Sequence, residues 1–584
     1  MDSQKRENIL NLALDTPENE RARSVELATG YDETTELWEV IVRHVGDITR
    51  LRDEGIEVVP LLSGYAILRL RREQLDIITN DGDILYIEKP KRLFFGVERG
   101  KAASCIQPLQ LGEAVQGALP QIYGRGVIVA VADSGIDILH PAFRNADGST
   151  RIVRIWDQTK AAADEYPSPF DYMRGREYTK EQIDELIKSF ERGEINRSEL
   201  PALDNSGHGT SVAGIATGSS VVRGVAPESD IIVVKLGLSG ENDFPRTTEL
   251  MMAVDYIVRT SLELNKPVAV NLSIGNTYGS HDGTALLETY LEAVSDIGRN
   301  VIVVGSGNEG SAGGHTSGIL VINEEEKIEL VVSTFETRLS LQIWKYYADV
   351  FTVMIEAPDG TRVGPLGEIL NTSQYTVGDT KLLVYYGEPA PYSSAQEIYI
   401  EFIPVADGGY INSGVWTIRL NPTRIVDGEY HMWLPENSVN NINTRFLRPT
   451  PGVTLTVPGT AAKVITVGAY DALLGSYADF SGRGFTRVER RIKPEIVAPG
   501  VGVVTAATGG GTTSVSGTSF ATPFVTGGAA LLMEWGIVNG NDRFLYGEKV
   551  KAYLIRGARQ LAGEETPSPK TGWGALCVAD SLPV

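Results

Sequence analysis

Residues 127–137 read Val-Ile-Val-Ala-Val-Ala-Asp-Ser-Gly-Ile-Asp, six apolar residues followed by an acid and small residues. A run without polar alternation is typical of a strand buried on both faces of a parallel sheet. Helix-like stretches separate further runs of this kind, which lie at 231–236, 268–272, 301–304 and 463–470. The alternation predicts an α/β domain with helices on both faces of a parallel sheet, and with its functional residues at the carboxyl ends of the strands.

Two stretches depart from this pattern. Residues 37–95 read as strand, helix, two strands, helix and strand, the βαββαβ order of a two-layer α+β (ferredoxin-like) sandwich. Between 319 and 451 the helical periods vanish, and strand-like segments alternate with Gly, Pro, Asn and Asp turns. We therefore expect four segments: an α+β module over 1–100, the α/β domain over 101–318, an all-β, jelly-roll-like insertion over 319–452, and the rest of the α/β domain over 453–584.

Composition narrows the function classes. The 584 residues include 53 basic and 75 acidic side chains, a net charge of −22. This charge repels both nucleic acid and anionic lipid, so we expect neither as a partner. Apolar runs such as 127–132 are six residues long, too short to span a membrane, and no apolar signal segment follows the N-terminus. Cys105 and Cys577 are too few for a disulfide scaffold, and two buried thiols are expected.

Three polar residues stand out in the α/β segments. Asp133 ends a predicted strand, where a turn or helix-capping role is the ordinary alternative to catalysis. His208 lies between two glycines, which leave its imidazole unobstructed. Ser519 begins a long apolar helix; a serine there is usually an N-cap, but its backbone N–H and the helix dipole could also stabilise an oxyanion.

A fourth polar residue, Asn308, follows the strand at 301–304. A turn asparagine is one interpretation, and a side-chain amide that donates to an oxyanion is the other. The four residues come in the order Asp, His, Asn, Ser. Asp, His, Ser is the chain order of subtilisin and differs from that of chymotrypsin and of the α/β-hydrolases.

With these motifs the sequence resembles the subtilisin-like serine proteases, or subtilases. The matching segments are Ala-Asp-Ser-Gly-Ile-Asp (132–137), Asn-Ser-Gly-His-Gly-Thr (205–210), Gly-Ser-Gly-Asn (305–308), Lys-Pro-Glu-Ile-Val-Ala-Pro-Gly (493–500) and Gly-Thr-Ser-Phe-Ala-Thr-Pro (517–523). The βαββαβ module resembles the propeptide of the family, which assists folding and then inhibits. The layout as a whole resembles the clostridial Csp-type subtilases of spore germination, and implies an intracellular or spore-associated protein.

The resemblance implies a serine endopeptidase acting on protein or peptide substrates. Ser519 would be the nucleophile, His208 the general base, Asp133 its orienting partner and Asn308 an oxyanion donor. The segment Ser273-Ile274-Gly275 matches the edge along which an extended substrate pairs as a strand, with an ordinary strand end as the alternative.

No cofactor and no metal is required by this chemistry. Many subtilases bind calcium, and Asp137 alone or Asp471 with Asp479 could do so here. Oxygen ligands abound in any acidic protein, however, and solvated carboxylates are the favoured interpretation.

The resemblance also implies self-cleavage in the linker near 97–110, after which the propeptide would stay bound as a non-covalent partner. Alternatives remain: a pseudoprotease-like signalling protein, a protease that cleaves only itself, or a carbohydrate-binding structural protein. The intact Asp133, His208, Asn308 and Ser519 favour an enzyme. The insertion could brace the fold or bind substrate or carbohydrate; the absence of an aromatic cluster in its sequence favours bracing.

Overall fold

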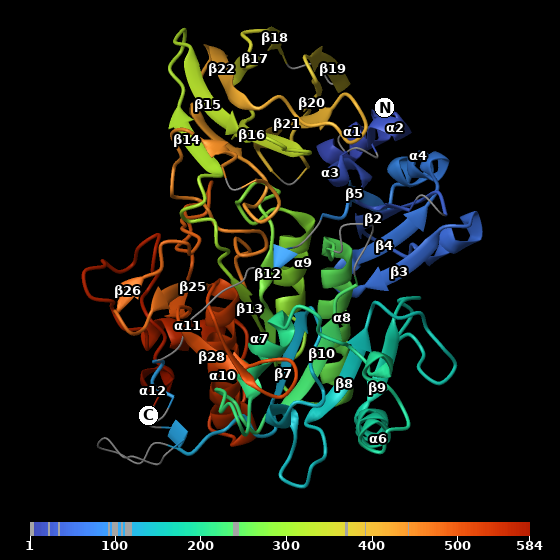
Figure 1. The fold of residues 1–584 in the computed structure, drawn as a ribbon, viewed down its shortest axis with the longest axis vertical. Helices are drawn as coiled ribbons and strands as arrows, with labels where there is room; N and C mark the ends of the chain where they lie inside the picture. Colours follow the sequence, from blue (N-terminus) through green and yellow to red (C-terminus); the bar gives the residue numbers. More distant parts are fainter. Residues whose placement is uncertain are drawn as a thin grey trace. The chain divides into compact units, whose positions relative to one another are not determined.

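The structure is a computed structural model. It describes residues 5–21, 24–32, 35–91, 94–95, 103–106, 109–110, 120–237, 244–367, 372–391, 393–441 and 443–583. The chain forms two compact units (Figure 1), each assembled from separate stretches of sequence. Unit 1 comprises Met1–Arg92, Asn276–Leu286 and Glu309–Thr454, and unit 2 comprises Leu93–Gly275, Leu287–Asn308 and Leu455–Val584.

Unit 2 is built on a nine-stranded sheet in the order β26-β25-β13-β11-β7-β10-β8-β9, with β27 also paired to β25. The pairs from β25 to β8 are parallel, while β9 and β26 pair antiparallel at the two edges. The strands are β7 (Ile128–Asp133), β8 (Ile152–Asp157), β9 (Arg176–Thr179), β10 (Asp230–Lys235), β11 (Val268–Leu272), β13 (Asn300–Gly305), β25 (Ile465–Asp471), β26 (Ser476–Tyr477) and β27 (Ile496–Pro499).

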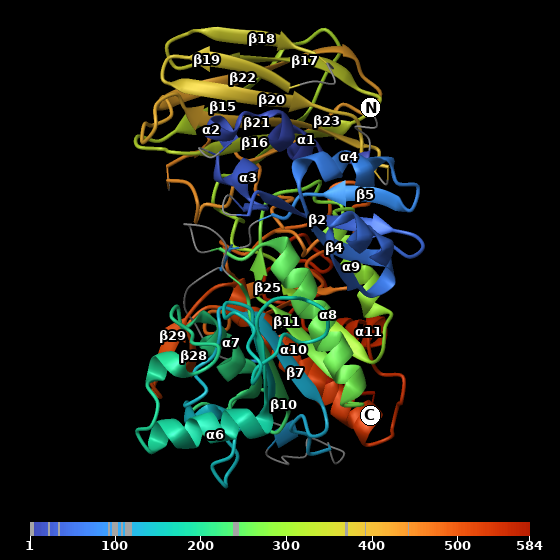
Figure 2. The ribbon, with the colours of Figure 1, turned by 90° about the vertical axis from the view of Figure 1, so that its right-hand side faces the viewer.

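Helices cover both faces of this sheet. Figure 2 shows α7 (His208–Thr217) on one side of the strands and α8 (Thr247–Glu263) on the other. Alternate residues of β7, Val129 and Val131, join a buried cluster with α7 and with α10 (Thr518–Met533). The remaining helices are α6 (Lys180–Glu191), α9 (Leu286–Ser295), α11 (Glu548–Arg556) and α12 (Val578–Ser581). The predicted α/β architecture is confirmed.

The helix that carries Ser519 is apolar along its whole length. It runs on through a π-helical turn to Val538, and this stretch alone, among the described residues, is long and apolar enough to cross a membrane. However, 83% of its most apolar window is buried inside the protein. The core helix of a water-soluble domain meets the same criterion, so the stretch is weak evidence for membrane insertion.

The two cysteines correct a prediction. Cys105 and Cys577 form a disulfide, with their Cα atoms 4.9 Å apart, instead of two buried thiols. Their separation of 472 residues in the sequence concealed the pairing, since only the fold brings residue 105 beside the start of α12. The bond joins the N-terminal and C-terminal ends of unit 2.

The N-terminal module of unit 1 has the expected strand and helix order, with differences in detail. The first helix predicted within 37–95 is a 3-10 helix (Thr49–Glu54), and the last strand of the module ends at Glu88, not at Phe95. Pro90 explains the early end, because proline has no N–H to continue a strand ladder. The antiparallel sheet and its helices are β1 (Tyr31–Asp32), β2 (Leu37–His44), β3 (Glu57–Leu61), β4 (Tyr65–Leu70), β5 (Ile84–Glu88), α1 (Asn8–Asp15), α2 (Glu18–Arg21), α3 (Val25–Ala28) and α4 (Arg72–Asn80).

The insertion is a sandwich of two antiparallel sheets, in the orders β14-β23-β16-β21-β20-β19 and β18-β17-β22-β15-β24. A single buried cluster fills the space between the sheets. The strands are β14 (His315–Ile319), β15 (Glu326–Val332), β16 (Leu339–Tyr346), β17 (Val350–Glu356), β18 (Arg362–Leu366), β19 (Thr372–Val377), β20 (Thr380–Tyr386), β21 (Ala395–Pro404), β22 (Gly414–Arg424), β23 (Glu429–Trp433) and β24 (Arg445–Phe446). The prediction of an all-β insertion is confirmed.

Within unit 1 the module and the insertion share a hydrophobic core. Leu10 and Leu12 of α1 belong to the same buried cluster as Leu383, Tyr399 and Ile403 of strands β20 and β21. The sequence did not indicate α1, because a helix of eight residues offers little more than two turns of periodicity.

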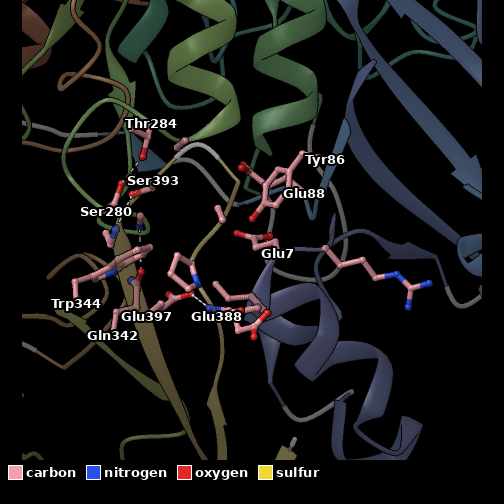
Figure 3. Close-up of a pocket in the computed structure, with 18 of the residues that line it drawn as sticks. Glu7, Tyr86, Glu88, Ser280, Thr284, Gln342, Trp344, Glu388, Ser393 and Glu397 are labelled. Atoms are coloured by element: carbon pink, nitrogen blue, oxygen red, sulfur yellow. Dashed lines mark hydrogen bonds between the residues drawn. The ribbon is translucent and has the colours of Figure 1, made fainter. Parts of the chain in front are cut away.

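Carboxylates gather in a cavity at this junction (Figure 3). Lys91 Nζ forms ion pairs with Glu7 and Glu88 at 2.8 and 2.7 Å. Glu397 of β21 has no cation within ion-pair distance among the described residues, and its one described hydrogen bond, from Asn8 Nδ2, is 3.5 Å long. Burial, with the negative charge of Glu7 adding to it, raises the pKa of Glu397 to about 8.

This pKa predicts a pH-dependent stability. The folded state holds a proton on Glu397 that the unfolded chain releases near its usual pKa of 4.5. The contribution of Glu397 to stability is therefore greatest below about pH 4.5 and falls as the pH rises to about 8, by up to about 1.4 kcal/mol per pH unit. We expect Glu397→Gln to raise the unfolding midpoint at pH 8 by roughly 2–4 °C, and to flatten its pH dependence.

Thermal unfolding of the wild type and the variant across this pH range is the measurement. Glu388→Gln, which alters a half-buried carboxylate that also lines the cavity, is the matched control and should leave the profile unchanged. Equal slopes in wild type and Glu397→Gln would contradict the prediction.

Candidate active site

Asp133 and His208 are in direct contact. Asp133 is the last residue of β7 and is fully buried, and its Oδ1 lies 2.7 Å from His208 Nδ1. The same oxygen accepts a hydrogen bond from the Ser134 N–H, also at 2.7 Å. Because a carboxylate only accepts, the proton of the imidazole lies on Nδ1 and Nε2 is left with its lone pair.

The structure requires glycine on each side of His208, for a different reason at each position. Gly207 has a φ of +77°, which lets the chain turn sharply into α7. Gly209 passes so near the first strand loop that a Cβ there would lie 2.2 Å from Gly135 O. Both features bring the start of α7 against the end of β7, where Asp133 lies.

Sequence reasoning missed the residue that fixes this turn. Asp204, which is 7% exposed, accepts hydrogen bonds from the backbone N–H groups of Gly207 and Thr210 at 2.9 and 2.8 Å. It also accepts one from Ser134 Oγ at 2.8 Å, which ties the turn to the end of β7. An aspartate three residues before a glycine at a helix start is a recognisable signal for such a turn.

Ser519 is the second residue of α10, after Gly517 and Thr518. It is 4% exposed, and its Oγ donates to the Ser273 carbonyl oxygen at 3.3 Å. Ser273 Oγ in turn donates to the Ser519 carbonyl oxygen at 2.8 Å. The ring centroid of Phe520, the next residue, lies 5.2 Å from that of His208, so the start of α10 lies beside the imidazole.

Asn308 is held beside the same helix start. Its Oδ1 accepts from the Thr518 N–H at 3.1 Å and from Thr518 Oγ1 at 3.2 Å. With the oxygen anchored, the Nδ2 group is the end that can donate elsewhere; it lies 3.6 Å from where a Cβ at Gly517 would stand. Thr518 is thus a second contributor that the sequence did not single out.

The segment Ser273–Gly275 already carries a paired strand. Ile274 and Gly275 form β12, which pairs antiparallel with β6 (Phe94–Phe95) in the register Ile274 to Phe95 and Gly275 to Phe94. A Cβ at Gly275 would lie 2.7 Å from Thr456 Oγ1, so this edge needs glycine. The chain itself therefore adds a strand at the edge predicted to hold an extended peptide.

No group of three or more His, Cys, Asp or Glu side chains is arranged as metal ligands in the part of the chain that the structure describes. Asp137, one candidate for calcium, instead bonds to Arg197 Nη2 and to the Gly509 N–H. The interpretation of Asp471 and Asp479 as solvated carboxylates, with no metal required, stays a prediction.

A parallel α/β sheet that brings these side chains together at its carboxyl edge is the arrangement of the subtilisin-like serine endopeptidases. The family model described as "Subtilase family" matches residues 124–373 and 438–574, and the model described as "Csp protease B prodomain" matches residues 4–91. The chain belongs to the subtilase family. The resemblance found in its sequence is confirmed.

Individual relatives agree with this assignment. The solved structure of the Clostridium perfringens CspB protease is 36% identical with a TM-score of 0.74, and the match covers 82% of this chain and 95% of that chain. The minor extracellular protease Vpr of Bacillus subtilis (strain 168) is 23% identical over 485 residues, 79% of this chain and 52% of that protein. The PII-type proteinase of Lactococcus lactis subsp. cremoris is 23% identical over 490 residues, 76% of this chain and 24% of that protein. The chain thus spans about half or less of the length of these curated relatives.

Proposed function

We propose that this protein is a serine endopeptidase that hydrolyses peptide bonds of protein substrates with Asp133, His208, Ser519 and Asn308. The observation that carries the proposal is the 2.7 Å contact between Asp133 and His208, next to a serine at the start of α10. Helix geometry adds a second reason, because the first N–H groups of a helix have no partner within it and can donate to an oxyanion.

In this mechanism Ser519 Oγ rotates away from the Ser273 carbonyl oxygen and attacks the scissile carbonyl while His208 Nε2 accepts its proton. Asp133 stabilises the imidazolium that forms. The negative oxygen of the tetrahedral intermediate lies between the Asn308 amide and the Ser519 N–H, both placed before charge develops. His208 then delivers the proton to the leaving amine, and water repeats the sequence on the acyl-enzyme.

The substrate would pair along β12, where β6 now lies. An extended peptide that adds to an exposed edge gains main-chain hydrogen bonds, and side-chain pockets supply selectivity. Since β6 follows the N-terminal module directly, the module would act as a propeptide whose end occupies the substrate edge and inhibits the enzyme. After cleavage it would remain as a non-covalent partner through the core that it shares with β20 and β21.

Self-cleavage follows from this arrangement. We expect purified wild-type protein to cut itself in the linker near 97–110, most of which lies outside the described residues and which follows β6 in the sequence. N-terminal sequencing of the larger fragment locates the cut. An intact 63.3 kDa band for the wild type would count against the prediction, and Ser519→Ala, which should stay uncut, is the control.

Two measurements test the proposed function as a whole. A fluorophosphonate should label Ser519 covalently, which a pseudoprotease would not permit. A proteome-derived peptide library should be cleaved in trans, which a protease confined to its own linker would not do. Wild-type protein that fails both tests contradicts the proposal.

We also propose a role in spore germination through activation of a proenzyme. The Csp protease B prodomain match supports this role. Incubating the purified protein with extracts of dormant spores should convert a proenzyme to a shorter active form, and no conversion would contradict the role without touching the peptidase activity.

A further inference from the structure

The side chain of Arg197 is a half-exposed cation joined to the loops that carry the active-site residues. Arg197 begins a 3-10 helix (Arg197–Glu199) in the polar stretch between β8 and α7. Its Nη2 lies 2.8 Å from Asp137 Oδ2, and this is its one described hydrogen bond. Asp137 is buried, with a side chain 3% exposed, whereas the Arg197 side chain is 47% exposed. One end of the guanidinium is therefore fixed and the rest faces solvent.

Asp137 connects this arginine to the site. It lies four residues after Asp133, and its backbone N–H donates to Thr210 Oγ1 in the first turn of α7 at 3.0 Å. Its Oδ2 also accepts from the Gly509 N–H at 2.7 Å. A Cβ at Gly207 would lie 3.9 Å from Thr508 Cγ2, so the same loop touches the turn that precedes His208.

That loop is the tip of a hairpin that ends two residues before the helix of Ser519. The hairpin strands are β28 (Val503–Ala506) and β29 (Thr512–Val515). Buried His140 binds the other end of the loop, at Gly511. Its Nδ1 accepts from the Ala142 N–H, so the ring proton is on Nε2, which donates to the Gly511 carbonyl oxygen at 2.9 Å. Arg197 thus sits on a framework fixed by hydrogen bonds at both ends of the loop.

The order of the strands in the sheet indicates on which side of the scissile bond Arg197 lies. Asn308 and Ser273–Gly275 follow the adjacent strands β13 and β11, and Asp133 ends the next strand, β7. The substrate edge is on β12, after β11, and Arg197 is joined to the loop after β7. His208 hands its proton to the departing amine, so its imidazole lies against the leaving-group side of the scissile bond. Asp137 ties Arg197 to the first turn of the helix that His208 begins and to the loop at Gly509.

We propose that Arg197 is a specificity-determining residue that selects substrates with a carboxylate, Asp or Glu, on the leaving-group side of the scissile bond. This rests on the proposed function. Arginine presents five N–H donors in a fixed plane, and here Asp137 orients that plane while leaving donors for a second carboxylate. In a chain of net charge −22, a fixed and half-exposed cation of this kind offers an acidic residue a local partner of opposite charge.

The experiment uses quenched peptides that the wild type cleaves, with Glu, Gln or Lys placed in turn at each position after the scissile bond. We expect kcat/KM with Glu to exceed that with Gln by about fivefold at one position, because Arg197 is half exposed, and the preference to fade at high salt. Arg197→Gln should abolish the preference and Arg197→Glu should reverse it toward Lys. If Arg197 had a purely structural role, its substitution would lower kcat/KM for the Glu, Gln and Lys peptides by the same factor.

Arg192→Gln is the matched control. Arg192 lies in the same stretch and pairs with Glu185 and Glu194, away from the loops described above. It should leave the preference unchanged, and fluorophosphonate labelling shows that each variant is folded. A wild type that cleaves peptides without charge preference, a preference that survives Arg197→Gln, or one confined to positions before the scissile bond overturns the inference and leaves the proposed function standing. A wild type that cleaves no peptide overturns both.

Discussion

Ser519→Ala is expected to lower kcat by about 10⁶-fold, with only oxyanion stabilisation and substrate binding left to accelerate the reaction. The physical reason is that no other described group next to His208 can take over the attack. Ser206 Oγ accepts from the His208 N–H and donates to Asp204. Ser273 Oγ donates to the Ser519 carbonyl oxygen on the substrate edge, so both hydroxyls are held by other partners. Steady-state hydrolysis of a peptide substrate by the purified variant is the measurement.

Ser211→Ala provides the control. Ser211 lies in the first turns of α7, is 2% exposed, and donates to the Ala506 carbonyl oxygen, so its loss tests burial of a hydroxyl without touching the site. It should keep most of the wild-type rate. A Ser519→Ala protein that retains more than a small percentage of wild-type activity would reject the assignment of the nucleophile.

Asp133→Asn should cost about 10⁴-fold in kcat, the loss that the same change causes in the trypsin triad. An asparagine of equal size would offer an N–H or a carbonyl to His208 Nδ1, and the ring could then turn its basic nitrogen away from Ser519. Because Asp133 Oδ1 also accepts from the Ser134 N–H, the amide oxygen would prefer that donor, leaving the NH₂ group near Nδ1.

The pH profile separates this explanation from simple misfolding. With the tautomer reversed, activity should recover partly at high pH, where hydroxide can replace the missing base. A variant whose activity is low but follows the wild-type pH profile would contradict the role given to Asp133. Unchanged thermal unfolding is the folding control.

Much of the α/β unit could be predicted because its strands are continuous apolar runs. The runs that end at Asp133 and before Asn308 match β7 and β13 within two residues. Strands β8 and β9 gave no such signal: they are near the sheet edge, and Arg154 and Glu177 interrupt their apolar character. The sequence was enough to predict which residues form the site and their order along the chain, but not the contacts between them.

Other features depend on interactions that sequence patterns do not encode. The strand pairing of Phe94–Phe95 with β12 was missed, since two apolar residues after Pro90 read as the end of the preceding strand. The anchoring of Asn308 by Thr518 and the hydrogen bond from Ser134 to Asp204 are contacts between distant segments. Each is specified by the fold as a whole, not by its own neighbours in the chain.

Because of the bond between Cys105 and Cys577, self-cleavage before Cys105 and self-cleavage after it give different products. On a denaturing gel, a cut before residue 105 gives a fragment that separates from the larger product even without reductant. A cut after it produces two pieces that migrate together on a denaturing gel until dithiothreitol is added. Comparing electrophoretic mobility with and without dithiothreitol therefore maps the scission to one side of Cys105. Persistence of the bond in the protein as made by its host would further indicate an oxidising surrounding.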